Sequence, residues 1–342
     1  MADFVLPIER ETALARLKRI QVKMRDTILV EMHRTSAAER SAVAYDGTGD
    51  TIYAIDRSME HVLLDECRAW VEAQPFVLIA EGLSDNGMLC FPDGALAGEA
   101  RFRLIVDPLD GTRGLMYDKR SAWILAGLAP NRGDATSLAD VVLAVQTEVP
   151  TTKQHLADVL WASAGEGAKG ERQNILTGVV QPLVLSPSRA TGLAHGFASL
   201  TKFFPGRKPI VAEIEEAMIK EIDGQSAEGK VRVFDDQYIS TGGQLYELIV
   251  GHDRFNGDIR PALMRNTTLP GDPPRMAAHP YDICTELIAR EAGVIVTNLN
   301  GGRLCDPLTV DGDVGWLGYA NAVLQARLEP VVQRLLRSYG LL

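Results

Sequence analysis

The chain carries the segment DPLDGT at residues 107–112, and the interpretation of the whole sequence begins there. Two carboxylates flank a proline, whose ring fixes one backbone dihedral angle. Hard cations such as Mg²⁺ prefer oxygen ligands, so the side chains of Asp107 and Asp110 and the carbonyl of Leu109 are candidate ligands. The same residue types also form ordinary turns. This segment alone leaves a turn and a metal site as open interpretations.

The residues around this segment favour the metal interpretation. The apolar runs FVLIAEG (76–82) and RFRLIVD (101–107) are typical of short strands, and they deliver Glu81 and Asp107 at their C-terminal ends. If the two strands are neighbours, these carboxylates lie side by side. Gly111 permits a close approach of the backbone, and Thr112 stands where a helix or turn can begin and where free N–H groups can receive a phosphate oxygen.

The rest of the first half reads as α+β. Helical spacing of apolar residues predicts a helix over 8–32, and a second is expected over 57–73, with Asp56 at the preceding strand-to-helix junction. Further strands are expected at 121–129, 139–149 and 157–163, which together with the first two suggest an antiparallel sheet packed on the helices.

After about residue 180 strands and helices alternate, which predicts a smaller α/β domain. The expected elements are strands at 182–186, 230–234 and 294–298, a helical region through about 221, helices near 241–251 and 280–292, and a C-terminal helix. Residues 264–279 read as a loop. We therefore expect two domains, 1–180 for metal binding and catalysis, and 181–342 completing the site.

Composition excludes several classes of protein. The 46% hydrophobic and 23% charged residues are typical of a globular chain, and the net charge of -10 argues against binding a nucleic acid polymer. The four cysteines lack CxxC spacing, so reduced thiols are expected. Without a signal peptide or an apolar run long enough to span a bilayer, the default expectation is a cytoplasmic protein that binds no membrane.

Four segments, in order, resemble the inositol monophosphatase family, part of the lithium-sensitive, magnesium-dependent phosphatases that also include fructose bisphosphatases and bisphosphate nucleotidases. DPLDGT matches the family's DPxDGT signature, and Glu81 matches its upstream glutamate. TIYAIDRSMEHVL, which contains Asp56, is similar to T-x-x-D-x-x-x-E, and Tyr281-Asp282 in HPYDICTELIAREAG is similar to the late W-D motif.

This resemblance implies an αβαβα sandwich, a homodimer, and two or three Mg²⁺ ions per subunit that serve the hydrolysis of a small phosphorylated metabolite. One ion would be held by Glu81, Asp107 and the Leu109 carbonyl, and a second by Asp107, Asp110 and Asp282. Water would be activated between them. Asp56 and Thr112 would exchange a proton with that water, and the substrate side would be formed by Gly111, Thr112, Arg113 and His279.

Departures from the family pattern bear on the substrate. Gly82 replaces the second residue of the usual E-E pair, and Arg113-Gly114-Leu115 replaces the usual x-N-F after DGT. Arg113 is a candidate contact for a second phosphate or a carboxylate. An inositol phosphate or a related sugar or polyol phosphate is the first expectation. The alternatives are 3′-phosphoadenosine 5′-phosphate, fructose 1,6-bisphosphate, and a non-catalytic metabolite-binding protein with the same fold.

Overall fold

The computed structural model describes residues 10–46, 51–70, 74–83, 86–224 and 230–342, without the side chains of 44–46, 51, 52, 54 and 56–58. In order, the elements of the first half are α1 (Arg10–Arg34), α2 (Ala37–Arg40), β1 (Val43–Asp46), β2 (Thr51–Tyr53), α3 (Ala54–Arg68), β3 (Phe76–Ala80), β4 (Met88–Phe91), β5 (Phe102–Asp110), α4 (Thr112–Met116), β6 (Ala122–Pro130), η1 (Leu138–Asp140), β7 (Leu143–Val149), β8 (Leu156–Ser163), β9 (Ala168–Asn174) and β10 (Val180–Leu183). Those of the second half are β11 (Gly196–Leu200), α5 (Lys208–Asp223), β12 (Val233–Phe234), α6 (Thr241–Ile249), β13 (Asp253–Asp258), α7 (Arg260–Arg265), α8 (Glu286–Ala292), β14 (Ile295–Asn298), β15 (Trp316–Tyr319) and α9 (Ala322–Ser338).

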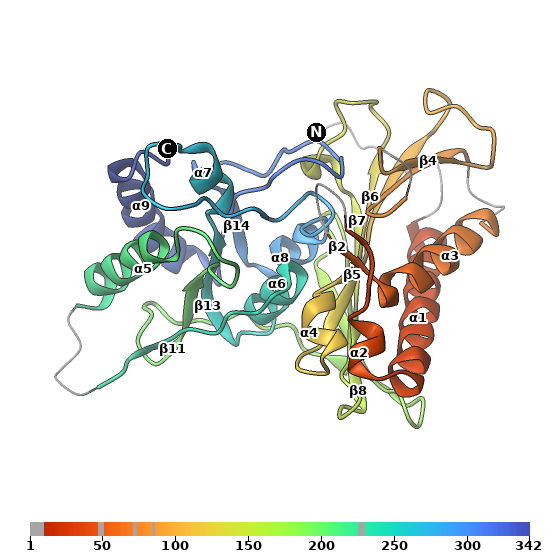
Figure 1. The fold of residues 1–342 in the computed structure, drawn as a ribbon, viewed down its shortest axis with the longest axis horizontal. Helices are drawn as coiled ribbons and strands as arrows, with labels where there is room; N and C mark the ends of the chain where they lie inside the picture. Colours follow the sequence, from red (N-terminus) through yellow and green to blue (C-terminus); the bar gives the residue numbers. More distant parts are fainter. Residues whose placement is uncertain (1–9, 47–50, 71–73, 84–85, 225–229) are drawn as a thin grey trace.

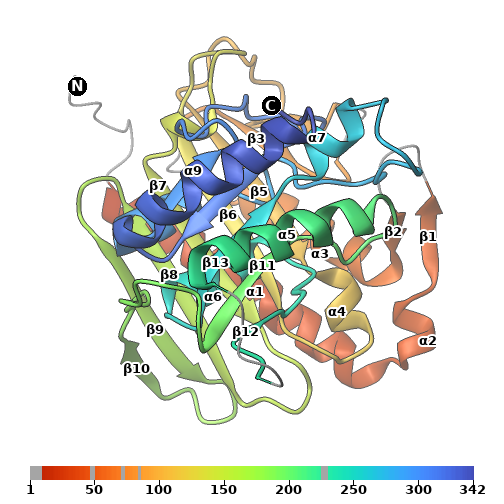
Figure 2. The same ribbon diagram turned by 90° about the vertical axis from the view of Figure 1, so that its left-hand side faces the viewer.

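These elements stack in five layers, which confirms the predicted αβαβα sandwich (Figure 1). An eight-stranded sheet, in the order β10-β9-β8-β7-β6-β5-β3-β4, has α1 and α3 on one face. Its other face packs on α6 and α8, which lie against a five-stranded sheet in the order β12-β11-β13-β15-β14. The last layer is formed by α5 and α9, which cross the front of the molecule in Figure 2.

Alternation of apolar side chains explains the two faces of the large sheet. On β6, Ile124 and Ala126 point toward α1 and α3, whereas Trp123 and Leu125 point toward α6. Successive residues of a strand project to opposite sides, so a run that is apolar throughout buries both faces. The strand that precedes the site, β5, follows the same rule with Leu104 on one face and Ile105 on the other.

Several predictions about the elements are wrong in detail. β3 and β5 pair in parallel, so the large sheet is mixed rather than antiparallel. β10 pairs with β9 and belongs to the large sheet, not to the smaller domain, because its backbone completes the β9 ladder. The helix expected over 57–73 runs from Ala54 to Arg68, and the one expected near 280–292 begins only at Glu286. The division into domains at residue 180 stays a prediction.

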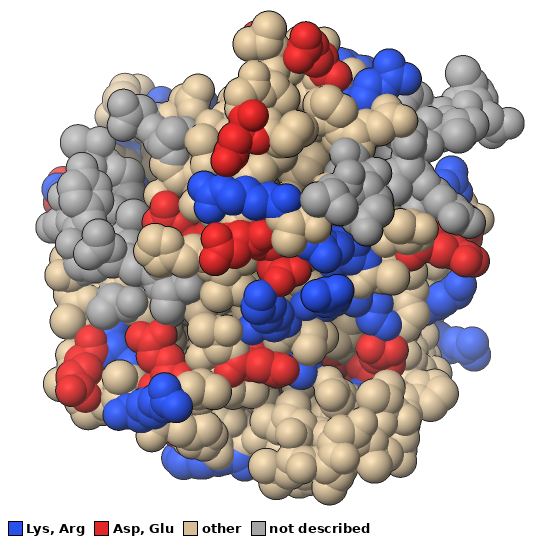
Figure 3. All heavy atoms as spheres, turned by 90° about the vertical axis from the view of Figure 1, so that its right-hand side faces the viewer, with Lys and Arg blue, Asp and Glu red and all other residues tan. Residues whose placement is uncertain are grey.

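The charges on the outer surface and the apolar character of the helices are relevant to nucleic acid and membrane binding. Basic and acidic side chains alternate over the side of the molecule that carries α1 and α3 (Figure 3), and no single-sign basic patch covers the described part of that face. None of the helices in the described part of the chain combines the length and the apolar character needed to cross a membrane. The four cysteines are free thiols, as expected.

Candidate metal centre

A bulge in β5 places the two aspartates of DPLDGT on one face of the sheet. Asp107 lies opposite Leu125 of β6, and Asp110 lies opposite Trp123, so β5 uses three residues where β6 uses two. In a regular strand, residues three apart face opposite sides, and the one extra residue cancels that offset. Both carboxylates therefore point toward α6, while the side chain of Leu109 packs in the apolar cluster on the other face.

Glu81 reaches the same edge because β3 runs parallel to β5. The last paired residues are Ala80 and Val106, so one further step along each strand brings Glu81 beside Asp107. Glu81 lines the cleft at this edge, together with both aspartates. The parallel pairing, which the sequence did not predict, is what makes the two strand-end carboxylates neighbours.

A tight turn follows the bulge. Gly111 has φ 95°, in the left-handed region that favours glycine, and a Cβ there would meet Cβ of Ser240 at 3.1 Å. Thr112 then begins α4, and its hydroxyl donates to the Leu109 carbonyl at 2.7 Å. The Leu109 N–H in turn donates to Asp107 Oδ1 at 2.9 Å. A carbonyl oxygen has two lone pairs, so the Leu109 carbonyl keeps one for a cation.

The N-terminus of α6 holds Asp110. Asp110 Oδ2 accepts hydrogen bonds from the Ser240 hydroxyl at 2.8 Å and from the Gly242 N–H at 2.6 Å. Ser240 also caps α6 by accepting from the Gly243 N–H. A Cβ at Gly242 would meet Leu125 at 2.6 Å and Asp110 Oδ2 at 3.0 Å, so only glycine lets the helix approach this closely. The positive end of the helix dipole stabilises the carboxylate.

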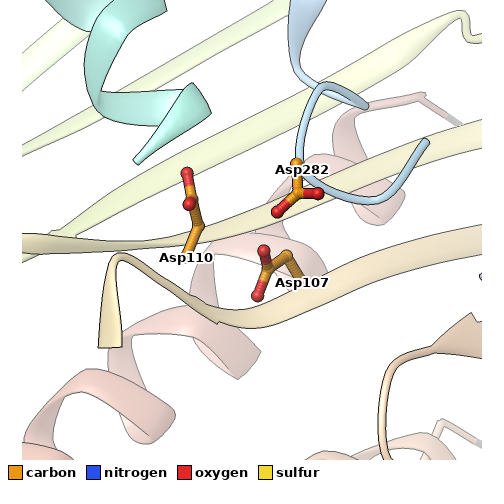
Figure 4. Close-up of side chains that lie close together, drawn as sticks. All are labelled: Asp107, Asp110 and Asp282. Carbon is orange, nitrogen blue, oxygen red and sulfur yellow. The ribbon is translucent and has the colours of Figure 1, made fainter. Parts of the chain in front are cut away.

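Asp282 approaches from the turn before α8 and completes a cluster of three aspartates (Figure 4). One ligand oxygen from each of Asp107, Asp110 and Asp282 lies within 4.8 Å of the others. The His279 N–H donates to Asp282 Oδ2 at 2.6 Å, and His279 Nδ1 lies 3.4 Å from the same oxygen. Glu81 lines the same cleft but is not one of these three.

The cluster accumulates negative charge in a buried place. Burial raises the pKa of Asp107 well above its usual range, and the charges of Asp110, Asp282 and Glu81 raise it further. Burial and Asp282 raise the pKa of Asp110 to about 8, although Ser240 and the α6 N–H groups oppose the shift. Carboxylates that repel one another in this way are the hard oxygen donors that a divalent cation neutralises. The residues present therefore fit a divalent cation that prefers oxygen ligands, of which Mg²⁺ is one.

The three aspartates line an open cleft that contains about 560 Å³ of empty space. Every candidate site residue from the sequence lines this cleft except Asp56: Glu81, Asp107, Leu109, Asp110, Gly111, Thr112, Arg113, His279 and Asp282. Asp56 lies in the first turn of α3, and its side chain is outside the described residues.

Sequence reasoning missed other lining residues: Phe203, Phe204, Ser240, Thr241 and Arg260. Ser240 could have been predicted, because it stands shortly before the apolar run QLYELIV, and serine in that position is a typical N-cap of a helix. Phe203, Phe204 and Arg260 could not have been predicted in this way. They come from the loop after β11 and from the start of α7, and the packing of the small sheet alone brings them to the cleft.

No protein-family model matches the sequence, and no curated protein matches it either. Solved structures do match along nearly the whole chain. Fructose-1,6-bisphosphatase from Leishmania major is similar with a TM-score of 0.65 at 13% identity, covering 94% of each chain. The extragenic suppressor protein suhB from Bartonella henselae gives 0.62 at 15% identity, covering 94% of this chain and 98% of that one. Inositol monophosphatase II from Staphylococcus aureus gives 0.58 at 17% identity, covering 96% and 98%.

These matches show that the chain has the fold of solved inositol monophosphatases and fructose-1,6-bisphosphatases. The resemblance predicted from DPLDGT and its partner segments is thereby confirmed at the level of the fold.

Proposed function

We propose that this protein is a Mg²⁺-dependent phosphatase that transfers the phosphoryl group of a small phosphomonoester to water. The observation that carries the proposal is the convergence of Asp107, Asp110 and Asp282 in one cleft. Asp107 and Asp110 belong to β5, whereas Asp282 belongs to the turn before α8, and each is anchored by hydrogen bonds that leave carboxylate oxygens facing the others. Solved structures with this fold include inositol monophosphatases and fructose-1,6-bisphosphatases, which supports the same reaction class.

The ligand sets proposed here are those that the family resemblance implies. Asp107 would contribute to both ions, with Glu81 and the Leu109 carbonyl completing one set and Asp110 and Asp282 the other. Bound divalent ions would lower the pKa of a water and stabilise the developing charge on the leaving oxygen. The hydrogen bonds of Asp110 to Ser240 and Gly242 fix one oxygen and leave the other to face the cluster. Such anchoring keeps the ligands in place before any ion binds.

Proton transfer is proposed for Thr112 and Asp56. A hydroxyl carries one hydrogen, and that of Thr112 is donated to the Leu109 carbonyl. For this role, the Thr112 hydroxyl would donate its hydrogen to Asp56 in place of the Leu109 carbonyl, and its oxygen would accept a proton from the attacking water as its own proton passes to Asp56. Gly111 and Thr112 would present N–H groups to the phosphate. His279 would contact the leaving group, and Arg113 the remainder of the substrate.

The first candidate substrate is an inositol phosphate or a related sugar or polyol phosphate. A nucleotide is the second, because one solved structure of similar fold, an inositol monophosphatase II, has 2′AMP bound. Fructose 1,6-bisphosphate is the third, by likeness to the Leishmania major enzyme. A non-catalytic metabolite-binding role stays the alternative of another class, and the complete carboxylate cluster argues against it. Lithium sensitivity, a homodimer and cytoplasmic residence stay predictions.

A substrate panel with matched variants tests the proposal. Purified protein is assayed with Mg²⁺ on inositol 1-phosphate, fructose 1,6-bisphosphate and 3′-phosphoadenosine 5′-phosphate. We expect Asp107→Asn to lower phosphate release by about 100-fold or more, because it removes the shared ligand. Asp272→Asn, an exposed aspartate in the loop after α7, is the control and should stay near wild type. Unchanged activity and unchanged Mg²⁺ binding in Asp107→Asn would show that the metal centre is assigned wrongly.

A further inference from the structure

Besides the aspartates, the cleft is lined by a wall of aromatic and basic side chains: Phe203, Phe204, Arg113 and Arg260. Arg260 forms a buried ion pair with Asp258. Asp258 ends β13, and Arg260 begins α7 two residues later. Arg260 Nε donates to both carboxylate oxygens of Asp258, at 2.9 and 3.0 Å, and Nη2 donates to Oδ2 at 2.5 Å. The backbone N–H of Arg260 donates to Oδ1 as well. Asp258 therefore takes one edge of the guanidinium and fixes its plane.

The third guanidinium nitrogen, Nη1, does not take part in the ion pair with Asp258. Arg260 is 5% exposed, and its Nη1 is buried without a hydrogen-bond partner among the described residues. An arginine nitrogen buried without a partner destabilises a fold, and a well-packed apolar residue would serve the core as well as a buried ion pair. The ion pair is therefore better explained by function than by stability, and the position of Arg260 in the cleft lining suggests that the function is ligand binding.

Aromatic rings hold the guanidinium in place. Arg260 Cζ lies 4.8 Å from the ring centre of Phe203 and 5.5 Å from that of Phe204, and the two rings meet edge to face. Arg113 stands on the same ring system, with its Cζ 5.2 Å from the centre of Phe204. Phe204 is thus shared between two cations that line one wall.

The loop that carries these rings is fixed at both ends. At its start, the Thr201 N–H donates to the Gly257 carbonyl at 2.8 Å, next to Asp258. At its end, Arg207 is buried and donates to the carbonyls of Leu263 and Asn266, which bound the C-terminal part of α7. Gly206 leaves no room for a Cβ, which would lie 2.5 Å from Pro274. The wall is therefore held in position without a ligand, which lowers the entropy cost of binding one.

We propose that Arg260 and Arg113 bind a second anionic group of the substrate, a phosphate or a carboxylate, in the same cleft as the metal centre. This inference rests on the proposed phosphatase function and narrows its substrate class to phosphomonoesters that carry another anion. Among the candidates above it therefore favours fructose 1,6-bisphosphate and 3′-phosphoadenosine 5′-phosphate over an inositol or polyol monophosphate. A planar guanidinium forms strong, charge-assisted hydrogen bonds with phosphate and carboxylate oxygens, and its bonds to a neutral polyol hydroxyl are weaker. Asp258 acts as the positioning residue for Arg260.

Two substrate pairs that differ in one group test the proposal. Fructose 1,6-bisphosphate is compared with fructose 1-phosphate, and 2-phosphoglycerate with glycerol 2-phosphate, so that one pair reports a second phosphate and the other a carboxylate. We expect wild type to favour the more anionic member of at least one pair in kcat/KM. Arg260→Gln should lower that preference by about 10- to 100-fold, mainly through KM, as expected for a lost hydrogen bond to a charged group.

Two further variants keep the result interpretable. Arg265→Gln removes the same charge from the exposed end of the same helix and should leave the preference as in wild type. Arg113→Gln, which leaves the buried pair intact, should lower the preference in the same direction as Arg260→Gln and covers the case in which the latter does not fold. Equal losses on both members of each pair in these variants, or a wild type without any preference, would overturn the proposal.

A binding measurement separates this proposal from the proposed function. Calorimetric titration of the protein in EDTA with fructose 1,6-bisphosphate and with fructose 1-phosphate involves no turnover. Tighter binding of the bisphosphate that is lost in Arg260→Gln supports the anion site even if the protein hydrolyses nothing. Equal binding of both compounds by wild type counts against the anion site even if the phosphatase proposal holds.

Discussion

Removing one carboxylate from the metal centre should stabilise the protein when metal is absent. The perturbation is Asp110→Asn, which keeps the shape of the side chain. The amide oxygen of asparagine can replace Asp110 Oδ2 as acceptor for Ser240 and Gly242, and the amide N–H₂ then faces the remaining carboxylates as a donor. A repulsive group is thereby exchanged for an attractive one, without loss of the α6 contacts.

The magnitude follows from the spacing of the three aspartates. Two unit charges 4.8 Å apart repel by about 3 kcal/mol at an effective dielectric constant of about 20. Asp110 takes part in two such pairs, but water in the open cleft and partial protonation reduce the repulsion, in keeping with its pKa of about 8. We expect a gain in the free energy of unfolding of about 2 kcal/mol in EDTA near neutral pH, or about 3 °C in melting temperature for a chain of 342 residues.

Mg²⁺ should reverse the order of stability. A ligand at about 100 times its Kd stabilises the native state by about 2.7 kcal/mol, and a variant that lacks one ligand oxygen forgoes most of this. The assay is thermal and urea unfolding of wild type, Asp110→Asn and the exposed control Asp272→Asn, each in EDTA and in excess Mg²⁺. If Asp110→Asn is less stable than wild type in EDTA, the aspartates do not repel one another and the electrostatic reasoning is wrong.

Two further predictions concern the pH dependence of stability that Glu148 causes and the contribution of Ser240 to stability and activity. Burial raises the pKa of Glu148 to about 7, so the folded state keeps its proton where the unfolded state loses it near 4.5. That contribution to stability is complete below about pH 4.5 and is lost as pH rises through about 7. Relative to Glu148→Gln, wild type should lose about 3 kcal/mol over this window in urea unfolding, and parallel profiles would contradict the reasoning. Ser240→Ala removes both a donor to Asp110 and the cap of α6, and should cost about 1 to 2 kcal/mol and about tenfold in phosphatase activity. Ser36→Ala, which removes the cap of the distant α2, should lower stability without that loss of activity.

Most of the candidate site could be predicted from short stretches of the sequence. Glu81 and Asp107 follow apolar runs that form strands on their own pattern, and Gly111 needs its left-handed conformation for reasons confined to the turn. The bulge between Asp107 and Asp110 was not predictable in the same way, because it is defined by the register against β6. Register depends on pairing with a distant strand, which a single stretch of sequence does not encode.

The wall of the cleft that contains Arg260 could not be predicted from the sequence for a related reason. β13 has the sequence DRFNGD, and Asp, Asn and Gly are depleted in strands, so the segment reads as a turn. It is nevertheless the central strand of the small sheet, between β11 and β15. Burial among neighbours overrides the weak local preference, and the buried pair of Asp258 and Arg260 at its end becomes visible only when the sheet is assembled.

The arrangement of ligands bears on how the two halves of the chain cooperate. Asp107 and Asp110 belong to the large sheet, whereas Asp282 precedes α8, and Asp110 is bonded to the first turn of α6. One apolar cluster joins β5 and β6 to α6, α8 and the small sheet. A cation held by all three aspartates would tie the same halves together at the cleft, where repulsion otherwise pushes them apart. Mg²⁺ is therefore expected to stabilise the contact between the halves more than either half by itself, so amide hydrogen exchange should slow most in α6 and in the turn before α8.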